Sequence, residues 1–428
     1  MTIKLKHKGV VLRGEKLGAD IKSKMYQVKE GDFILSGIDA RNGAFGIVPP
    51  ELDGAVVTND FWYFEIDDEV VDTEFFLELT STHWFDEICR KGSDGTTQRI
   101  RLQKDKFFNQ KIHLPDISEQ RLFNKQFQAI KTNNNKLTSE LTHQQTYLKN
   151  LRQQILQEAI EGKLTADWRA QNTDVEPASE LLKRITAEKS QLVKDKKIKA
   201  QNPLPPITNE EKPFELPQGW EWCRLGDICY KITDGFHNTP PKVTKGFPYI
   251  AATHVKSEKI DWSSCHYVSE EFHRELYTKT YPQRGEILLV NIGAGCGTPA
   301  IIDVDFEFSF KNTAILKFNQ KAILNTYLFN CFVLNRDSIY KDLTKGGLQP
   351  FLSLKIINDF LIPIPPFLEQ QAIVTKVEKL LALCDQLKTH VTQNETHAEK
   401  LMQAVLKEAF SHNNDAESSV IPKAMAHA

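Results

Sequence analysis

The stretches LRQQILQEAI at 151–160 and LMQAVLKEAF at 401–410 are two copies of one segment, and they decide the fold. They align without a gap at an offset of 250 residues and share five identical residues. The alignment continues upstream to the Glu-Gln pairs at 119–120 and 369–370. Because solenoid repeats are much shorter, this period indicates a duplicated unit made of one domain and one long helix.

Both copies carry the apolar rhythm of a coiled coil, with spacings that alternate between four and three residues. A polar residue interrupts the rhythm at the same place in each copy. Helices over 116–162 and 366–412 would each be roughly 65 Å long, too long to bury an apolar stripe alone. We expect the two helices to pack as a rod; the alternative is that each stripe packs on its own domain. The predicted seam is Leu137, Leu141, Gln144, Leu148, Leu151 and Ile155 with Leu387, Val391, Asn394, Ala398, Leu401 and Val405.

Each predicted helix follows a globular unit with short apolar runs separated by Gly, Asn, Asp and Pro, which is typical of strands and turns. In the second unit, strands are expected at 287–290, 300–302 and 314–318, and a helix over 323–345. GDFILSGIDARNGAFGIVP at 31–49 in the first unit parallels GEILLVNIGAGCGTPAIID at 285–303. No part of the first unit matches the opening LPQGWEW of the second, so the first is expected to be incomplete at its N-terminus. The predicted class is α+β, with two α/β domains.

These boundaries define six predicted segments. They are a first domain over 1–115, a first long helix over 116–162, a connector over 163–212, a second domain over 213–365, a second long helix over 366–412 and a disordered tail over 413–428. The connector contains seven Lys or Arg against two acidic residues between 183 and 199. Such a run either contacts nucleic acid or serves solubility or subunit docking.

Composition narrows the class of protein. Hydrophobic residues make up 40% of the chain and charged residues 26%, which indicates a soluble globular protein rather than a disordered or membrane chain. The seven cysteines form no CxxC pair, and the start lacks the apolar stretch of a signal peptide, so a reduced, cytoplasmic protein is expected. The formal charge of −2 means that any DNA binding must depend on local patches.

Three features together resemble the specificity (S) subunit of Type I restriction-modification systems. They are EGKLTADWRAQN at 161–172 followed by ELLKRITAEK, KPFELPQGWEWCRLGDI at 212–228, and the twice-used Pro-to-Glu-Gln entry into a long helix. The resemblance implies two target-recognition domains, each reading half of a split double-stranded DNA site, on two antiparallel helices with pseudo-twofold symmetry. It also implies docking of two methyltransferase (M) subunits and of restriction/translocase (R) subunits in a heteromeric complex.

Reading bases requires hydrogen-bond donors and acceptors on loops that reach the major groove. Two polar loops in each domain fit this requirement, although each can also be an ordinary turn. The candidate DNA-binding residues are Lys231, Thr233, Asp234, Gly235, His237, Asn238, Lys345, Gly346 and Gln349 in the second domain, and Arg41, Asn42, Lys91, Ser93, Thr96, Thr97, Gln98 and Arg99 in the first.

The sequence predicts no catalytic residues and no metal ligands. GAGCGT at 293–298 lacks the GK[ST] ending of a phosphate-binding loop, and NPLPP at 202–206 lacks the aromatic residue of an amino-methyltransferase motif. The resemblance implies that this chain binds no cofactor and that S-adenosylmethionine, ATP and Mg²⁺ belong to partner subunits. Two other functions remain open: a coiled-coil scaffold that does not read sequence, and a self-sufficient DNA methyltransferase.

Overall fold

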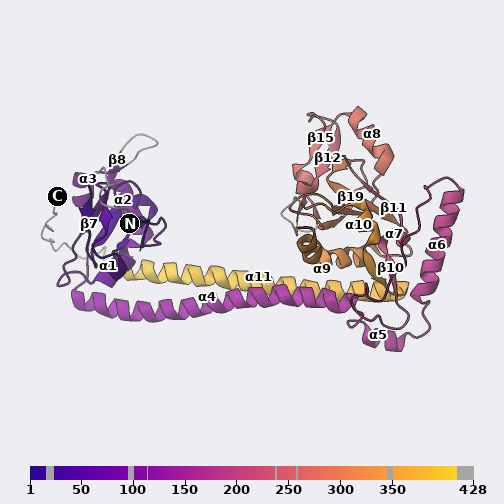
Figure 1. Cartoon of the computed structure of the whole chain (residues 1–428). Coiled ribbons are helices and arrows are strands. Elements are labelled where there is room, and N and C mark those ends of the chain that lie inside the picture. The colour runs from indigo at the N-terminus through magenta and orange to yellow at the C-terminus, as the bar shows by residue number, and fades with distance from the viewer. Residues whose placement is uncertain are drawn as a thin grey trace. The chain divides into compact units, whose positions relative to one another are not determined.

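A computed structural model describes residues 1–15, 24–94, 101–112, 114–236, 239–256, 259–344 and 350–411 (Figure 1). The chain divides into two compact units. The first comprises Met1–Gln144 and His390–Ala428, and the second comprises Gln145–Thr389. The predicted tail over 413–428 lies outside the described residues.

The first unit is built around a three-stranded antiparallel sheet in the order β5-β4-β7. Aromatic side chains fill its core, where Phe45 contacts both Phe33 of the same sheet and Phe85 of helix α2. Its elements are β1 (Thr2–Ile3), β2 (Val10–Val11), β3 (Tyr26–Gln27), β4 (Phe33–Ser36), η2 (Ala40–Asn42), β5 (Phe45–Ile47), η3 (Pro50–Leu52), β6 (Val56–Val57), β7 (Phe61–Phe64), α1 (Thr73–Thr80), α2 (His83–Lys91), β8 (Ser93–Asp94), β9 (Arg101–Leu102) and α3 (Lys104–Phe108).

The second unit contains a four-stranded antiparallel sheet, β11-β19-β16-β17, buried on both faces. Ile287 and Leu289 of β16 face the helices, whereas Leu288 and Val290 face the smaller sheet β15-β12-β18. This double burial explains why β16 reads ILLV without a polar residue.

The elements of the second unit begin with its helices α5 (Ala166–Gln171), α6 (Ala178–Lys194), α7 (Leu225–Ile228), α8 (Glu270–Thr280), α9 (Asn325–Thr344) and α10 (Leu354–Asp359), with the short turns η4 (Ala252–His254) and η5 (Trp262–Ser264). Its strands are β10 (Glu221–Arg224), β11 (Cys229–Asp234), β12 (Phe247–Ala251), β13 (Val255–Lys256), β14 (Lys259–Ile260), β15 (His266–Val268), β16 (Ile287–Val290), β17 (Pro299–Ile301), β18 (Ser309–Lys311), β19 (Thr313–Phe318) and β20 (Leu361–Ile364).

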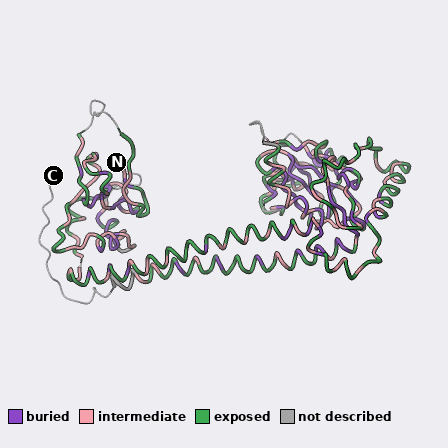
Figure 2. The backbone as a smooth tube through the Cα atoms, turned by 60° about the horizontal axis from the view of Figure 1, so that its bottom comes forward, coloured by how far each residue is buried: buried purple, intermediate pink, exposed green. Residues whose placement is uncertain are grey.

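Two long helices, α4 (Ile117–Ile160) and α11 (Phe367–Ser411), contribute to both units. In the second unit they run antiparallel, because Leu164 O, just beyond α4, accepts from Lys376 Nζ, whereas Arg152 Nη1 lies 2.6 Å from Asp385 Oδ1. Residue numbers therefore increase along α11 in the direction in which they decrease along α4. Figure 2 shows few buried residues along these helices compared with the globular parts.

The structure corrects the predicted seam. Leu141, Ile155, Val391 and Ala398 are buried as expected, and Gln144, Leu148 and Val405 are half-buried. Asn394 is exposed, and so are the four remaining leucines: Leu137 by 45%, Leu151 by 42%, Leu387 by 50% and Leu401 by 56%. Two packed helices bury only a narrow strip of each other's surface. In each helix this strip is centred on one residue of every seven, and the exposed leucines, which follow such a residue by three, lie beside the strip.

Among the helices that the structure describes, none is both long enough and apolar enough to span a lipid bilayer.

Candidate nucleic-acid interface

Both domains contain the same strand-turn-strand frame, formed by β4 and β5 in the first domain and by β16 and β17 in the second. Gly31 and Gly285, which both have a positive φ, precede β4 and β16 and donate to Val48 O and Ile302 O at 2.9 and 2.8 Å. The next residue is acidic in both domains, and its carboxylate accepts from the backbone N–H three residues upstream. The predicted parallel between 31–49 and 285–303 therefore describes one structural motif used twice.

In the second domain, three segments meet where β11 and β16 end, at one end of the four-stranded sheet. We call this end of the sheet the loop edge. Gly235, directly after β11, donates to Thr313 O at 3.0 Å at the start of β19. Leu352 N lies 2.8 Å from Asn291 O, just after β16. Gly293 N lies 3.0 Å from Pro350 O. The described ends of the two predicted loops of this domain therefore lie at the same edge.

The first of these loops is held tightly at its base. A Cβ on Gly235 would lie 2.2 Å from Phe310 O, so only glycine fits there. Asp234 Oδ1 is 3.1 Å from Lys279 Nζ. Thr233 is buried and pairs with Ile315 inside the sheet, so its side chain is not presented at the surface. His237 and Asn238 lie outside the described residues.

Lys231 lies in a small cluster of lysines beside this loop. Its ammonium donates to Lys279 O, and its pKa is lowered by partial burial and by Lys317 and Lys279. Lys317 is held by Glu286 at 2.6 Å. Three cations therefore face two carboxylates, Asp234 and Glu286, and this excess suits a phosphate contact. Lys345, Gly346 and Gln349 of the other loop lie outside the described residues.

In the first domain, the described candidates lie at the corresponding edge. Arg41 and Asn42 form the short turn η2 between β4 and β5, and Lys91 is exposed at the end of α2. Ser93 Oγ donates to Cys89 O at 2.6 Å, so the local backbone occupies its hydroxyl proton. Thr96, Thr97, Gln98 and Arg99 lie outside the described residues.

Sequence reasoning missed a basic segment that packs against η2. Lys6 N donates to Asn42 O and His7 N donates to Gly43 O, both at 2.9 Å. The run KLKHK at 4–8 thus adds positive charge beside Arg41. In the sequence, this segment stands out as a local cluster of basic residues in a chain whose net charge is close to zero.

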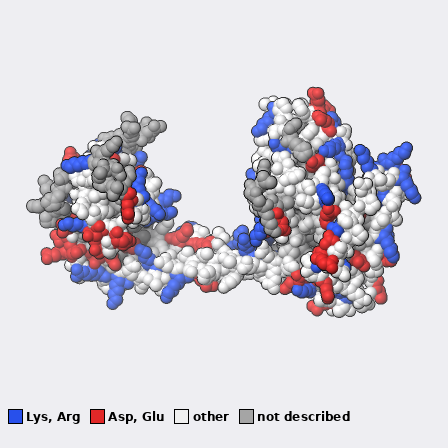
Figure 3. All heavy atoms as spheres, in the orientation of Figure 1, with Lys and Arg blue, Asp and Glu red and all other residues white. Residues whose placement is uncertain are grey.

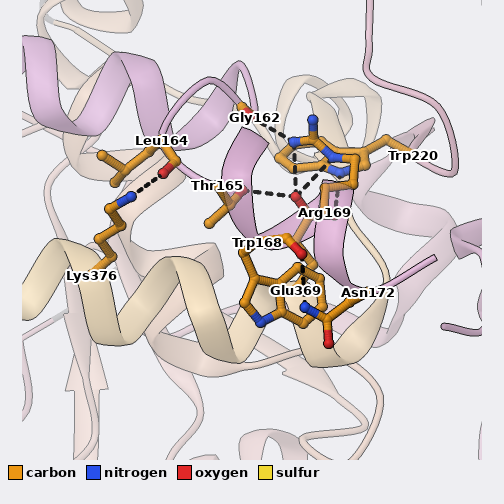
Figure 4. Close-up of polar contacts among 9 residues, drawn as sticks. All are labelled: Gly162, Leu164, Thr165, Trp168, Arg169, Asn172, Trp220, Glu369 and Lys376. Carbon is orange, nitrogen blue, oxygen red and sulfur yellow. Dashed lines mark hydrogen bonds and ion pairs between the residues drawn. The ribbon is translucent and has the colours of Figure 1, made fainter. Parts of the chain in front are cut away.

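The motif residues of the connector form a buried joint at the start of α11 (Figure 4). The Glu369 carboxylate is fully buried and accepts from Thr165 Oγ1 at 2.7 Å, Arg169 Nη2 at 2.8 Å and Trp220 Nε1 at 2.8 Å. Gly162, with a φ of +72°, allows the turn that brings Thr165 and Arg169 back to α11. These residues of EGKLTADWRAQN and LPQGWEW therefore position the domain on its helix.

The basic run of the connector lies on and just beyond α6, where Figure 3 shows Lys and Arg side chains gathered. Much of this charge has internal partners. Lys183 and Arg184 pair with Glu180 and Glu176, and Lys189 donates to Gly226 O at 2.7 Å. Burial lowers the pKa of Lys189. These contacts favour a structural role for the inner half of α6 over binding of nucleic acid.

Comparisons with known proteins agree on one family. The family described as the Type I restriction modification DNA specificity domain matches residues 217–395. The specificity subunits of the Type I restriction enzymes EcoAI and EcoEI from Escherichia coli are 35% and 32% identical, each over 56% of this chain. The matched part covers only 40% and 41% of those relatives, so the chain spans less than half of the length of these two proteins.

Solved structures show the same fold. A chain of the type I R-M system, described for its complex assembly and conformational transition, has a TM-score of 0.65 and 18% identity, with 93% of this chain and 86% of that chain covered. The HsdS subunit from Thermoanaerobacter tengcongensis has a TM-score of 0.55 and 19% identity, with 96% and 88% covered.

Proposed function

We propose that the chain is the sequence-reading subunit of a Type I restriction-modification system, because residues 217–395 match the Type I restriction modification DNA specificity domain and the two relatives that are 35% and 32% identical are specificity subunits of such enzymes. Each of its two domains would read one half of a split double-stranded DNA target. The chain would thereby direct methylation and cleavage that are carried out by partner subunits.

One observation carries this proposal: the same strand frame occurs twice and presents different side chains at its loop edge. The frame is repeated down to single hydrogen bonds at Gly31 and Gly285. The turn after the first strand reads DARNGA in one domain and GAGCGT in the other. A repeated frame with unlike tips suits the reading of two unlike half-sites, because base contacts come from the tips and not from the frame.

We further propose that the chain performs no catalysis and binds no cofactor itself. The named relatives are specificity subunits, and among the residues that the structure describes no three His, Cys, Asp or Glu side chains are placed to hold a metal ion. Burial raises the pKa of the Cys331 thiol to about 12, and that of Cys296 to about 11, so neither supplies a thiolate nucleophile near neutral pH. Methyl transfer from S-adenosylmethionine and ATP- and Mg²⁺-dependent cleavage would belong to the M and R subunits.

The exposed leucines on the long helices give a physical basis for partner docking. Leu151 and Leu387 in the second unit, and Leu137 and Leu401 in the first, are repeated at the same offset of 250 residues. Repeated exposed leucines on helices are typical of a surface that further helices cover. We propose that this surface binds M subunits, one for each copy of the repeat.

Selection from random duplex DNA tests the proposal. The chain, assembled with its M subunit, is expected to enrich duplexes that share two short conserved stretches separated by unread bases. Replacing Lys231 and Arg41 by alanine should reduce enrichment without dissociating the complex. Recovery of random sequence by an intact complex would favour the scaffold function instead.

A further inference from the structure

We propose that Phe351 and Arg101 occupy one equivalent position in the two domains and that each contacts a base pair in its own domain's half-site. Phe351 would contact the methyl group of a thymine, and Arg101 would bind the edge of a guanine. The inference rests on the DNA-reading function proposed above and assigns to it two residues outside the predicted loops.

The equivalence of the two positions follows from the backbone. Leu102 N donates to Gly37 O and Leu352 N donates to Asn291 O, both at 2.8 Å. In each domain the acceptor directly follows the central strand, β4 or β16. The short helices α3 and α10 then begin two residues after Leu102 and Leu352. The residue before each leucine, Arg101 or Phe351, therefore occupies the same place, 250 residues apart.

Phe351 is a large, half-exposed apolar side chain held at the loop edge. It is 51% exposed, although its backbone pairs with Ile292 in an isolated β-bridge. Gly293 N, which lies 3.0 Å from Pro350 O, fixes the preceding residue to the same turn. Single exposed hydrophobic residues are common, but this one is fixed where three polar segments converge. Phenylalanine makes apolar contact with the thymine methyl in the major groove.

Arg101 presents a charged, hydrogen-bonding side chain at the same place in the first domain. Its side chain is 55% exposed, and its Nη1 lies 2.8 Å from Asp60 Oδ1. The backbone of Asp60 is itself tied to the frame, because its carbonyl accepts from Gly37 N at 2.7 Å. The carboxylate therefore orients a guanidinium that keeps further donors available. Arginine binds O6 and N7 of guanine with two parallel hydrogen bonds.

Sequencing of methylated bases in a host that carries the chain with its M and R subunits tests the inference. Phe351→Ala should relax one position of one half-site by about tenfold, and Phe351→Arg should shift that position toward guanine. Arg101→Ala should relax one position in the other half-site, also by about tenfold. Phe306→Ala is the matched control, because Phe306 is 48% exposed, close to the 51% of Phe351, but follows β17 at the opposite end of the sheet.

The outcomes separate this inference from the proposed function. A split methylated motif that stays identical in the Phe351 and Arg101 variants would overturn the inference and leave the DNA-reading function intact. Changes that fall in the same half-site would also overturn it. Absence of a split motif with the unchanged chain would refute the proposed function. If Phe351→Ala abolishes methylation altogether, Phe351→Gln decides, because it keeps a long side chain at the frame but replaces the apolar contact with a polar one: an unchanged motif contradicts the thymine contact, and a changed base preference at one position supports it.

Discussion

Gln120 and Gln370 lie 250 residues apart, are both fully buried, and make the same three backbone hydrogen bonds. Gln120 Oε1 accepts from Asp72 N at 2.8 Å, and its amide donates to Val70 O and Pro115 O. Gln370 Oε1 accepts from Leu324 N at 2.9 Å, and its amide donates to Ala322 O and Pro365 O. Each glutamine thus fastens a domain to the first turn of a long helix, which explains why glutamine recurs at this position in both copies of the sequence.

Gln370→Ala should lower the free energy of unfolding by about 3 kcal/mol, because one backbone N–H and two carbonyl groups lose their buried partner. Urea denaturation followed by circular dichroism measures this loss. Gln371→Ala is the control. The side chain of Gln371, next to Gln370 in the sequence, is exposed, so its replacement should change stability by less than about 0.5 kcal/mol. Equal effects of the two substitutions would contradict the role given to Gln370.

Glu369→Ala should also destabilise the chain by about 3 kcal/mol, because it leaves the Arg169 guanidinium and the Trp220 N–H without their buried acceptor. The repeat supplies a matched control, since Glu119 occupies the same sequence position in the first copy but is exposed. Glu119→Ala is expected to leave the denaturation midpoint almost unchanged. A large effect of Glu119→Ala, or none of Glu369→Ala, would refute the buried joint.

Replacing Leu151 and Leu387 by aspartate should block assembly with the M subunit while the chain itself stays folded. The two side chains are exposed, so their loss costs little intramolecular packing, whereas a charge on a covered apolar surface weakens binding by about 30-fold or more. Light scattering after size-exclusion chromatography measures the mass of the mixture. Asn150→Asp adds charge at a neighbouring exposed position and should still assemble. Assembly that survives the leucine changes would place docking elsewhere.

Stability should fall as the pH drops below about 6.5, the ordinary pKa of histidine. His273 is fully buried against Phe247, and burial lowers its pKa, although Glu307 at 3.2 Å opposes this. A lowered pKa means that the unfolded chain binds the proton more readily, so stability is complete above the ordinary pKa and declines below it. Denaturation at pH 5, 6 and 7 should show a smaller decline for His273→Gln; identical slopes would contradict this.

The sequence predicts the positions of the helices and strands better than it predicts which of their residues are buried. Strand β16 was expected at 287–290, where it is found, and the helices expected over 116–162 and 366–412 begin at Ile117 and Phe367. Local periodicity and proline positions suffice for such predictions. The heptad pattern does not reveal whether a leucine faces the partner helix or the flank, because that depends on how many helices pack together. Leu137 and Leu401 were therefore assigned wrongly to the seam.

The candidate site was predicted less completely for the same physical reason. Polar residue types indicated the loop after β11, yet Thr233 belongs to the strand and is buried, because pairing with Ile315 extends β11 to Asp234. Phe351 was overlooked because an apolar residue next to a polar loop reads as core. Its exposure follows from the β-bridge to Ile292, a long-range contact that local pattern does not contain.

The most direct measurement is the methylome of a host that carries this chain with its M subunit, compared with a host that carries M alone. The account predicts a new methylated motif, present only with this chain, made of two separated and unlike half-sites. No new methylation from an assembled complex, or a single uninterrupted motif, would contradict the central claim that two copies of one frame read two halves of a DNA target.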